Sequence, residues 1–232
     1  MPNELKGAKN VMDLTTTNPQ IQFTSGPVNT GICVNGDAAV QVGTMSSSCL
    51  ETLTGSCAGG YVIAVWLFVG ERYTDETIEV FRFNEFSVEV VFESDESKWN
   101  QTFNFKMDGC GTLSKITGIR TMHQYTVIIA ASKASYQIYI DGQFIGQESC
   151  TGSGPWPATQ TLMVGGASRV CIDDFAVSGL AAMNYPDNFY TSLVKGILVS
   201  FICQNFWDEI STKKCLTRFS RSSAADTGFL IF

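Results

Sequence analysis

The sequence predicts an all-β fold, a two-sheet antiparallel jelly-roll sandwich that is followed by an irregular C-terminal tail. Apolar and polar residues alternate with a period of two along most of the chain, which is typical of strands with one buried face. Asn, Asp and Gly turn signals separate these runs, and no convincing amphipathic helix precedes Gly179. Many short strands without helices favour two packed antiparallel sheets.

The alternation is clearest in Phe86–Phe92 and Gln101–Met107, where apolar residues occupy every second position. Tyr61–Val69 is apolar at nearly every position, which predicts a central strand covered on both faces. The remaining predicted strands are Ile21–Ser25, Ala38–Val42, Ile78–Phe83, Tyr125–Ala131, Tyr136–Ile140, Leu162–Gly165 and Val170–Val177.

One turn signal predicts a hairpin. Asp141-Gly142 separates Tyr136–Ile140 from Gln143–Ile145, and a two-residue type I′ turn needs positive φ at both central positions, which Asp and Gly tolerate. Further turns are predicted at Asn35-Gly36-Asp37, Asp108-Gly109 and Gly165-Gly166.

The charge distribution divides the 232 residues into two units. Residues 1–194 contain 10 basic and 19 acidic residues, whereas residues 195–232 contain 5 basic and 3 acidic residues. The character of the sequence changes beyond Tyr185-Pro186. We therefore expect one jelly-roll domain over residues 1–185 and a C-terminal extension of unclear structure over residues 186–232. Whether the extension belongs to the folded domain stays open.

Composition excludes several classes of function. The net charge of −7 leaves no basic surface for a nucleic acid, so no nucleic-acid partner is expected. The uncharged runs Thr52–Gly70 and Gly196–Trp207 are respectively too polar and too short for a transmembrane helix, so no membrane span is predicted.

The eight cysteines favour disulfides over a zinc site. No C-x-x-C pair occurs and His123 is the only histidine, so a Cys/His zinc site cannot be assembled. Disulfides indicate an extracellular protein or the ectodomain of a membrane protein, although residues 1–10 contain no signal-peptide pattern. Cys150 and Cys171 bracket the hairpin, loop and strand near the end of the predicted domain and are candidates to close one loop. Cys49 with Cys57 and Cys203 with Cys215 are short-range candidates, which leaves Cys33 and Cys110.

A glycosylation acceptor agrees with a secretory route. The segment Asn100-Gln101-Thr102 has the N-x-Ser/Thr pattern and follows Trp99 in a polar stretch. Asn100 is therefore a candidate glycosylation site.

Catalytic motifs are weak. A catalytic triad would have to use His123, which begins an apolar strand, and no G-x-S-x-G elbow is present; a histidine at the edge of a strand is the simpler interpretation. Glu93-Ser94-Asp95-Glu96 resembles the start of a glycosidase motif but lacks the second Glu that would serve as acid/base. The acidic residues of this region are more simply explained as a solvated sheet edge and loops.

Asp173 is a candidate metal ligand. In an undistorted strand it shares its side with Phe175 and Val177, and a carboxylate on an apolar face must be hydrogen-bonded, paired or bound to a metal. A structural calcium ion is one possibility. The alternative is a carboxylate that accepts backbone N–H groups from a neighbouring loop.

Three aromatic residues are candidates for ligand binding, because exposed rings stack on sugar faces. They are Trp99, Trp156 in a Gly/Pro-rich loop, and Tyr139. For each, packing in the core or in a loop is the alternative.

Five segments carry a family resemblance through their order and spacing: Gly31–Val42, Tyr61–Leu67, Tyr136–Gly142, Thr161–Gly166 and Cys171–Val177. Together they resemble laminin-G-like domains of the concanavalin A-like lectin/glucanase superfamily. The resemblance covers residues 4–183. The His123-Gln124-Tyr125 segment departs from the Trp-His-His that is common in the family, and the tail after Pro186 has no counterpart there.

The resemblance implies a non-enzymatic extracellular recognition or adhesion module that binds a glycan or an extracellular protein. It implies no required cofactor, although some members hold a calcium ion, and it places the carboxylate of the family's Ile-Asp-Asp segment at Asp173. Two alternatives remain: a diverged glycoside hydrolase of the same fold, and a purely structural module of a larger multidomain protein.

Overall fold

The computed structural model describes residues 13–14, 18–25, 30–46, 51, 57–71, 74–93, 100–118, 122–130, 134–151 and 157–180. Over these ranges the chain forms fourteen strands, which lie in two antiparallel seven-stranded sheets. The prediction of a two-sheet antiparallel sandwich is confirmed. Within the same ranges, no helix has the length and apolar character needed to cross a membrane. The predicted extension over residues 186–232 lies outside the described residues.

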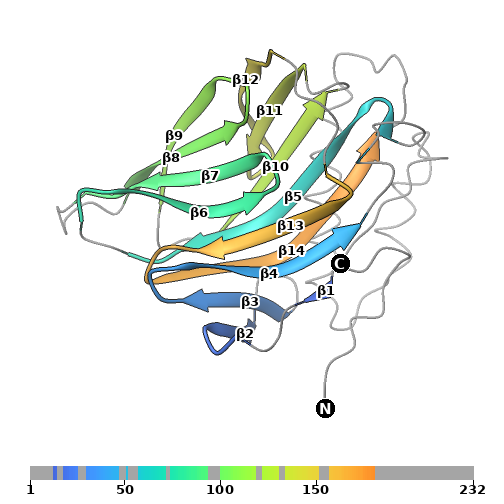
Figure 1. Ribbon diagram of the computed structural model, residues 1–232. Helices are drawn as coiled ribbons and strands as arrows, with labels where there is room; N and C mark the ends of the chain where they lie inside the picture. Colours follow the sequence, from blue (N-terminus) through green and yellow to red (C-terminus); the bar gives the residue numbers. More distant parts are fainter. Residues whose placement is uncertain are drawn as a thin grey trace, which may run out of the picture.

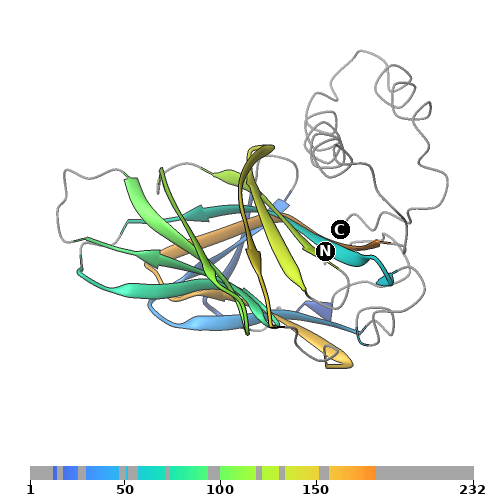
Figure 2. The same cartoon turned by 90° about the horizontal axis from the view of Figure 1, so that it is seen from above.

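The two sheets lie face to face (Figures 1 and 2). The first sheet has the order β1-β4-β13-β6-β7-β8-β9 and the second has the order β12-β11-β10-β5-β14-β3-β2. The strands of the first sheet are β1 (Asp13–Leu14), β4 (Ala39–Ser46), β13 (Thr159–Gly165), β6 (Thr77–Phe83), β7 (Phe86–Val91), β8 (Asn100–Met107) and β9 (Thr112–Gly118). Those of the second are β12 (Gln143–Ser149), β11 (Ser135–Ile140), β10 (His123–Ala130), β5 (Gly60–Val69), β14 (Arg169–Leu180), β3 (Thr30–Asn35) and β2 (Ile21–Ser25).

Aromatic side chains fill much of the core between the sheets. Phe83 of β6 and Phe175 of β14 meet edge to face with ring centroids 5.1 Å apart, and Phe105 of β8 lies 5.7 Å from Tyr125 of β10. Tyr136 of β11 reaches across the core, where its hydroxyl lies 2.8 Å from the Phe105 carbonyl oxygen and 2.7 Å from that of Gly111. Apolar burial and aromatic contacts therefore hold the two sheets together.

β5 is the central strand that the sequence predicts. It lies between β10 and β14 in the second sheet. Ile63 and Val65 point into the core, whereas Val62 and Ala64 on the opposite face are also buried. Because both faces are covered, the strand contains almost no polar residues.

β9 was not predicted. Its sequence, Thr112–Gly118, is largely polar, with Leu113 packed against the core and Ile116 exposed to solvent on the outer face. It is an edge strand, paired only with β8. An edge strand needs fewer apolar residues than a central one, which explains the weak alternation.

The predicted hairpin at Asp141-Gly142 is confirmed. β11 ends at Ile140 and β12 begins at Gln143, and φ is 49° at Asp141 and 76° at Gly142. Positive φ at both central positions is the requirement of a type I′ turn.

A bulge in β14 corrects the predicted orientation of Asp173. Asp173 pairs with Trp66 of β5, the register shifts before Ala176, and Asp174 has a φ of 44°. Because of this shift Ile172 and Phe175 both face the core, so Asp173 does not share the side of Phe175 and Val177. It lies on the outer face of the second sheet, although only 4% of it is exposed.

The disulfides correct the predicted pairing of Cys150 with Cys171. Cys33 of β3 bonds to Cys171 of β14, its partner in register, and Cys110 bonds to Cys150. The second bond joins the segment before β9 to the end of β12 and therefore links the edges of the two sheets. Cys57 is also disulfide-bonded, but Cys49, Cys203 and Cys215 lie outside the described residues, so their pairings stay predictions.

Candidate functional site

The outer face of the β11–β12 hairpin carries the most distinctive group of side chains in the part of the chain that the structure describes. Three pairs face one another across the two strands: Ser135 and Ser149, Gln137 and Gln147, and Tyr139 and Phe144. We call Gln137, Tyr139, Phe144 and Gln147 the hairpin patch. Side chains that are directly opposite on one face of an antiparallel pair lie in contact.

A β-bulge brings these residues to one face. Phe144 and Gln147 are three positions apart, so in a regular strand they would point to opposite faces. The register shifts between Ile138 and Tyr139, and Ile145 is the extra residue on β12. This insertion turns Phe144 to the side of Gln147, while Ile145 packs against the core.

The opposite face of β12 lies against β9. A Cβ atom added at Gly146 would lie 2.9 Å from Leu113 Cδ2, and one added at Gly111 would collide with the Glu148 carboxylate. The Cys110–Cys150 disulfide closes the same edge. The inner side of the hairpin is therefore fixed against the first sheet, which leaves the hairpin patch on the outside.

The two rings of the patch have different roles. Phe144 is 56% exposed, whereas Tyr139 is 3% exposed. Their ring centroids lie 5.4 Å apart in an edge-to-face arrangement, which is a favourable aromatic geometry. The expectation that Tyr139 is an exposed aromatic is wrong: it supports Phe144 from below, and Phe144 offers the accessible ring. A direct contact of Tyr139 with a ligand stays a prediction.

A chain of hydrogen bonds orients the amides of the patch. The Tyr139 hydroxyl donates to Gln137 Oε1 over 3.0 Å, and Gln137 Nε2 donates to Gln147 Oε1 over 3.0 Å. Gln147 is exposed, and its Nε2 group has no protein acceptor among the described residues. The patch therefore presents two N–H donors beside an exposed ring.

Sequence reasoning missed Phe144 and the two glutamines. The two-residue turn at Asp141-Gly142, once predicted, already places Tyr139 opposite Phe144. The pairing of Gln137 with Gln147 depends on the bulge, for which no residue in the hairpin gives a clear signal.

His123 is the first residue of β10 and is bound to the tip of the hairpin. Its Nδ1 lies 2.7 Å from Asp141 Oδ2, while its Nε2 is buried and has no hydrogen-bond partner among the described residues. No serine or cysteine in those residues bonds to the imidazole, so the His–Asp pair there lacks the nucleophile of a triad. Burial raises the pKa of the neighbouring Tyr125 hydroxyl well above its ordinary value, and the Asp141 charge raises it further.

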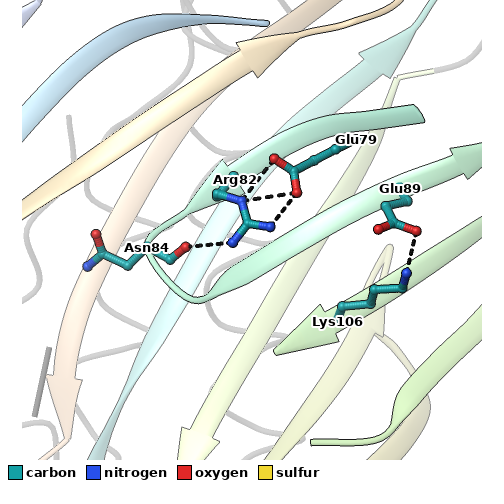
Figure 3. A network of polar contacts seen from close by, with 5 residues as sticks. All are labelled: Glu79, Arg82, Asn84, Glu89 and Lys106. Carbon is teal, nitrogen blue, oxygen red and sulfur yellow. Dashed lines mark hydrogen bonds and ion pairs between the residues drawn. The ribbon is translucent and has the colours of Figure 1, made fainter. Parts of the chain in front are cut away.

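The outer face of the first sheet carries ion pairs (Figure 3). Arg82 donates from Nε to Glu79 Oε1 over 2.9 Å and also bonds to the Asn84 carbonyl oxygen, while Lys106 pairs with Glu89. Glu79 and Glu89 face each other across β6 and β7, a pair of carboxylates that sequence reasoning missed. Each is engaged by a cation, which is typical of a solvated sheet face.

The remaining predicted site residues are not brought to the hairpin patch. Glu93 follows β7, and Asn100 begins β8. Asp95, Trp99 and Trp156 lie outside the described residues. Ligand binding by the two tryptophans and glycosylation at Asn100 therefore stay predictions.

Asp173 has a protein partner. Its Oδ1 accepts a hydrogen bond from the backbone N–H of Asp174 over 2.9 Å. The alternative to a metal was a bond from a backbone N–H group of a neighbouring loop; here the donor is the adjacent residue. Nowhere in the described ranges do three His, Cys, Asp or Glu side chains gather as metal ligands. Calcium at Asp173 would thus need backbone carbonyl oxygens or water as further ligands, and it stays a prediction.

Solved structures share the fold of this chain. The binding domain of Paraclostridial Mosquitocidal Protein 1 has a TM-score of 0.54 at 13% identity, and the match covers 83% of this chain and 48% of that one. The binding domain of botulinum neurotoxin serotype G has a TM-score of 0.53 at 12% identity, covering 84% of this chain and 47% of that one. The chain therefore spans about half the length of these neighbours.

A third neighbour was solved with a sugar. It is the ligand-binding domain of botulinum neurotoxin serotype D in complex with N-acetylneuraminic acid, with a TM-score of 0.51 at 8% identity over 81% of this chain and 46% of that one. No family model and no curated protein matches the sequence. The likeness is one of fold, a β-sandwich shared with receptor-binding domains, and it does not confirm the laminin-G-like resemblance.

Proposed function

We propose that the chain is a non-enzymatic extracellular recognition module that binds a glycan through the hairpin patch. The observation that carries the proposal is the exposed Phe144 ring beside the N–H donors of Gln147, for which the described residues supply no acceptor. Sugar rings have an apolar face of C–H groups that stacks on aromatic rings, and hydroxyl groups that bond to amides. A few oriented polar groups beside an apolar surface are typical of ligand sites.

Rigidity supports this assignment. The ring of Phe144 lies against Tyr139, the amides are oriented by hydrogen bonds, and the hairpin is anchored by Cys110–Cys150 and by the His123–Asp141 pair. A binding surface that is ordered before the ligand arrives loses less conformational entropy on binding.

The comparisons support the proposal at a coarse level. The neighbouring structures are binding domains rather than catalytic ones, and one contains a bound sugar. Disulfides are typical of extracellular proteins, and two are present between described residues. A glycoside hydrolase would instead need a carboxylate pair at about 5 to 9.5 Å that flanks a sugar, whereas the facing Glu79 and Glu89 are engaged by Arg82 and Lys106.

A glycan array with the oxidised full chain tests the proposal. The unmodified protein, Phe144→Ala and Ile116→Ala are compared, because Ile116 is an equally exposed apolar residue on an edge strand of the other sheet. We expect selective binding that is lost in Phe144→Ala and retained in Ile116→Ala. A blank array for the unmodified protein would overturn glycan binding and favour a protein-binding or structural module.

The same array tests the calcium prediction. Each measurement is made with calcium and again with a chelator, and Asp173→Asn is included as a third variant. A signal that the chelator and Asp173→Asn both abolish supports a calcium ion at Asp173. A signal that neither treatment changes contradicts it.

A further inference from the structure

We infer that the hairpin patch selects neutral hexopyranose glycans and disfavours anionic ones such as sialic acids or uronic acids. The inference rests on the proposed function and names the class of sugar. Its basis is the charge of the segment that forms the patch: residues 134–151 contain Asp141 and Glu148 and no lysine or arginine.

The donors of the patch suit hydroxyl groups better than a carboxylate. Its oriented side chains are amides, a phenol and a phenyl ring, and none carries a positive charge. Strong carboxylate recognition uses Arg or Lys in charge-assisted or bidentate hydrogen bonds. A neutral hydroxyl, in contrast, is well matched by the Nε2 group of Gln147.

Acidic groups lie on the same hairpin. Asp141 is exposed at its tip, two residues beyond Tyr139, and Glu148, next to Gln147, points to the opposite face of β12, towards Gly111. The Asp141 carboxylate is bonded to the imidazole of His123, which is charged only when it is protonated. The chain as a whole carries −7, so an anionic ligand meets repulsion at long range as well.

One cation could oppose this effect. Gly111 faces Glu148 and Leu113 faces Gly146, and Lys115, the next residue on that face of β9, is exposed. Lys115 belongs to the sheet edge behind β12 rather than to its outer face. Lys106, the other lysine of this region among the described residues, is paired with Glu89. Counted over the described residues of β9 and of the hairpin, the charge is therefore negative even with Lys115 included.

The test uses matched pairs of probes with the oxidised full chain. The probes are lactose and cellobiose, and the same disaccharides with the terminal hydroxymethyl group oxidised to a carboxylate. We expect the neutral member of at least one pair to bind about fivefold or more tightly than its anionic counterpart. High salt should reduce this ratio, because it screens repulsion between exposed charges.

Two variants test which charged residues cause the difference in affinity between the neutral and the carboxylate probes. The double variant Asp141→Asn, Glu148→Gln should bring the ratio close to one, because Asn tolerates the positive φ at position 141. Lys115→Gln should increase the ratio, and it also serves as a matched control for a change of one surface charge. Loss of binding to both members of each pair in Phe144→Ala would place the preference at the hairpin patch.

Failure of this inference can be distinguished from failure of the proposed glycan binding. Equal or tighter binding of the carboxylate probes, reduced by Lys115→Gln, would overturn the inference and show that Lys115 captures the anion, while glycan binding itself would stand. If none of the four probes binds, the neutral-hexose inference is overturned, and the glycan array decides separately whether the proposed function stands.

Discussion

Phe144 and Tyr139 face each other across the β11–β12 hairpin, with ring centroids 5.4 Å apart and only the phenylalanine accessible to solvent. One ring can therefore contact a ligand while the other holds it in place. The Tyr139 hydroxyl also begins the hydrogen-bond chain that orients Gln137 and Gln147. Substitutions at these two positions should consequently affect binding and stability in different proportions.

Phe144→Ala should abolish binding and cost little stability. The side chain is 56% exposed, and losing its edge-to-face contact with Tyr139 should lower the free energy of unfolding by about 1 kcal/mol. Urea denaturation measures this, with Ile116→Ala as control. A loss of several kcal/mol in Phe144→Ala would contradict the assignment of Phe144 as an accessible ligand contact.

Tyr139→Phe should weaken binding while retaining the fold. The ring stays under Phe144, but the hydroxyl that bonds to Gln137 is lost, which should cost about 1 kcal/mol of unfolding free energy. Gln137 is then free to turn away from Gln147, so affinity for the glycan should fall. Calorimetric titration checks this, and an affinity equal to that of the unmodified protein would show that the hydrogen-bond chain does not matter for recognition.

Gly142→Ala should destabilise the hairpin. Its φ of 76° lies in the left-handed region, where an alanine costs roughly 1 to 2 kcal/mol. Gln143→Ala, at an exposed position next to the turn, is the control and should change little. Thermal denaturation measures the melting temperatures of both variants. Equal melting temperatures for Gly142→Ala and Gln143→Ala would contradict the type I′ turn.

Non-reducing peptide mapping should recover Cys33 linked to Cys171 and Cys110 linked to Cys150. The double variant Cys110→Ala, Cys150→Ala should lose roughly 2 to 4 kcal/mol of stability, because the bond closes a long loop. Binding should weaken as well, since the bond holds the edge behind the hairpin patch. Finding Cys150 linked to Cys171 would contradict the described architecture.

High pH should destabilise the protein through Tyr136. Burial raises the pKa of its hydroxyl to about 12 from the ordinary 10.0, and the Glu148 charge adds to the shift, whereas a hydrogen bond to the backbone of Leu113 opposes it. Because the pKa is higher in the folded state, the unfolded state loses its proton first as pH rises. The contribution of Tyr136 is therefore complete below pH 10.0 and is lost as pH rises towards 12.

To test this loss of stability, the unfolding free energy is measured for the unmodified protein and for Tyr136→Phe as pH rises from 10.0 towards 12. The difference between the two proteins should shrink as pH increases. A difference that stays constant would mean that Tyr136 does not titrate in this window.

Alternation of apolar and polar residues was enough to predict the sandwich, because a strand with one buried face has a period of two. It failed at two of the bulges, those in β14 and β12. The insertion before Ala176 moved Asp173 to the outer face, and the insertion at Ile145 joined Phe144 to Gln147. A bulge shifts every following side chain to the other face, so the site was less predictable than the fold.

Disulfide pairing was unpredictable for a different reason. Cys33 and Cys171 are 138 residues apart and meet only because β3 and β14 are neighbours in the second sheet. Pairing the cysteines that bracket the C-terminal hairpin, loop and strand therefore selected the wrong partner for Cys171. The two-residue turn at Asp141-Gly142, by contrast, depends on local backbone preferences alone and was predicted correctly.

The most direct test of the account is nuclear magnetic resonance of the labelled protein during titration with the strongest neutral glycan of the array. We expect the largest shifts at the side-chain amide of Gln147, the ring of Phe144 and the backbone of β12, because these groups contact the sugar. Shifts confined to the face of Glu79, Arg82, Glu89 and Lys106, with the hairpin unchanged, would contradict the assignment of the hairpin patch as the binding site.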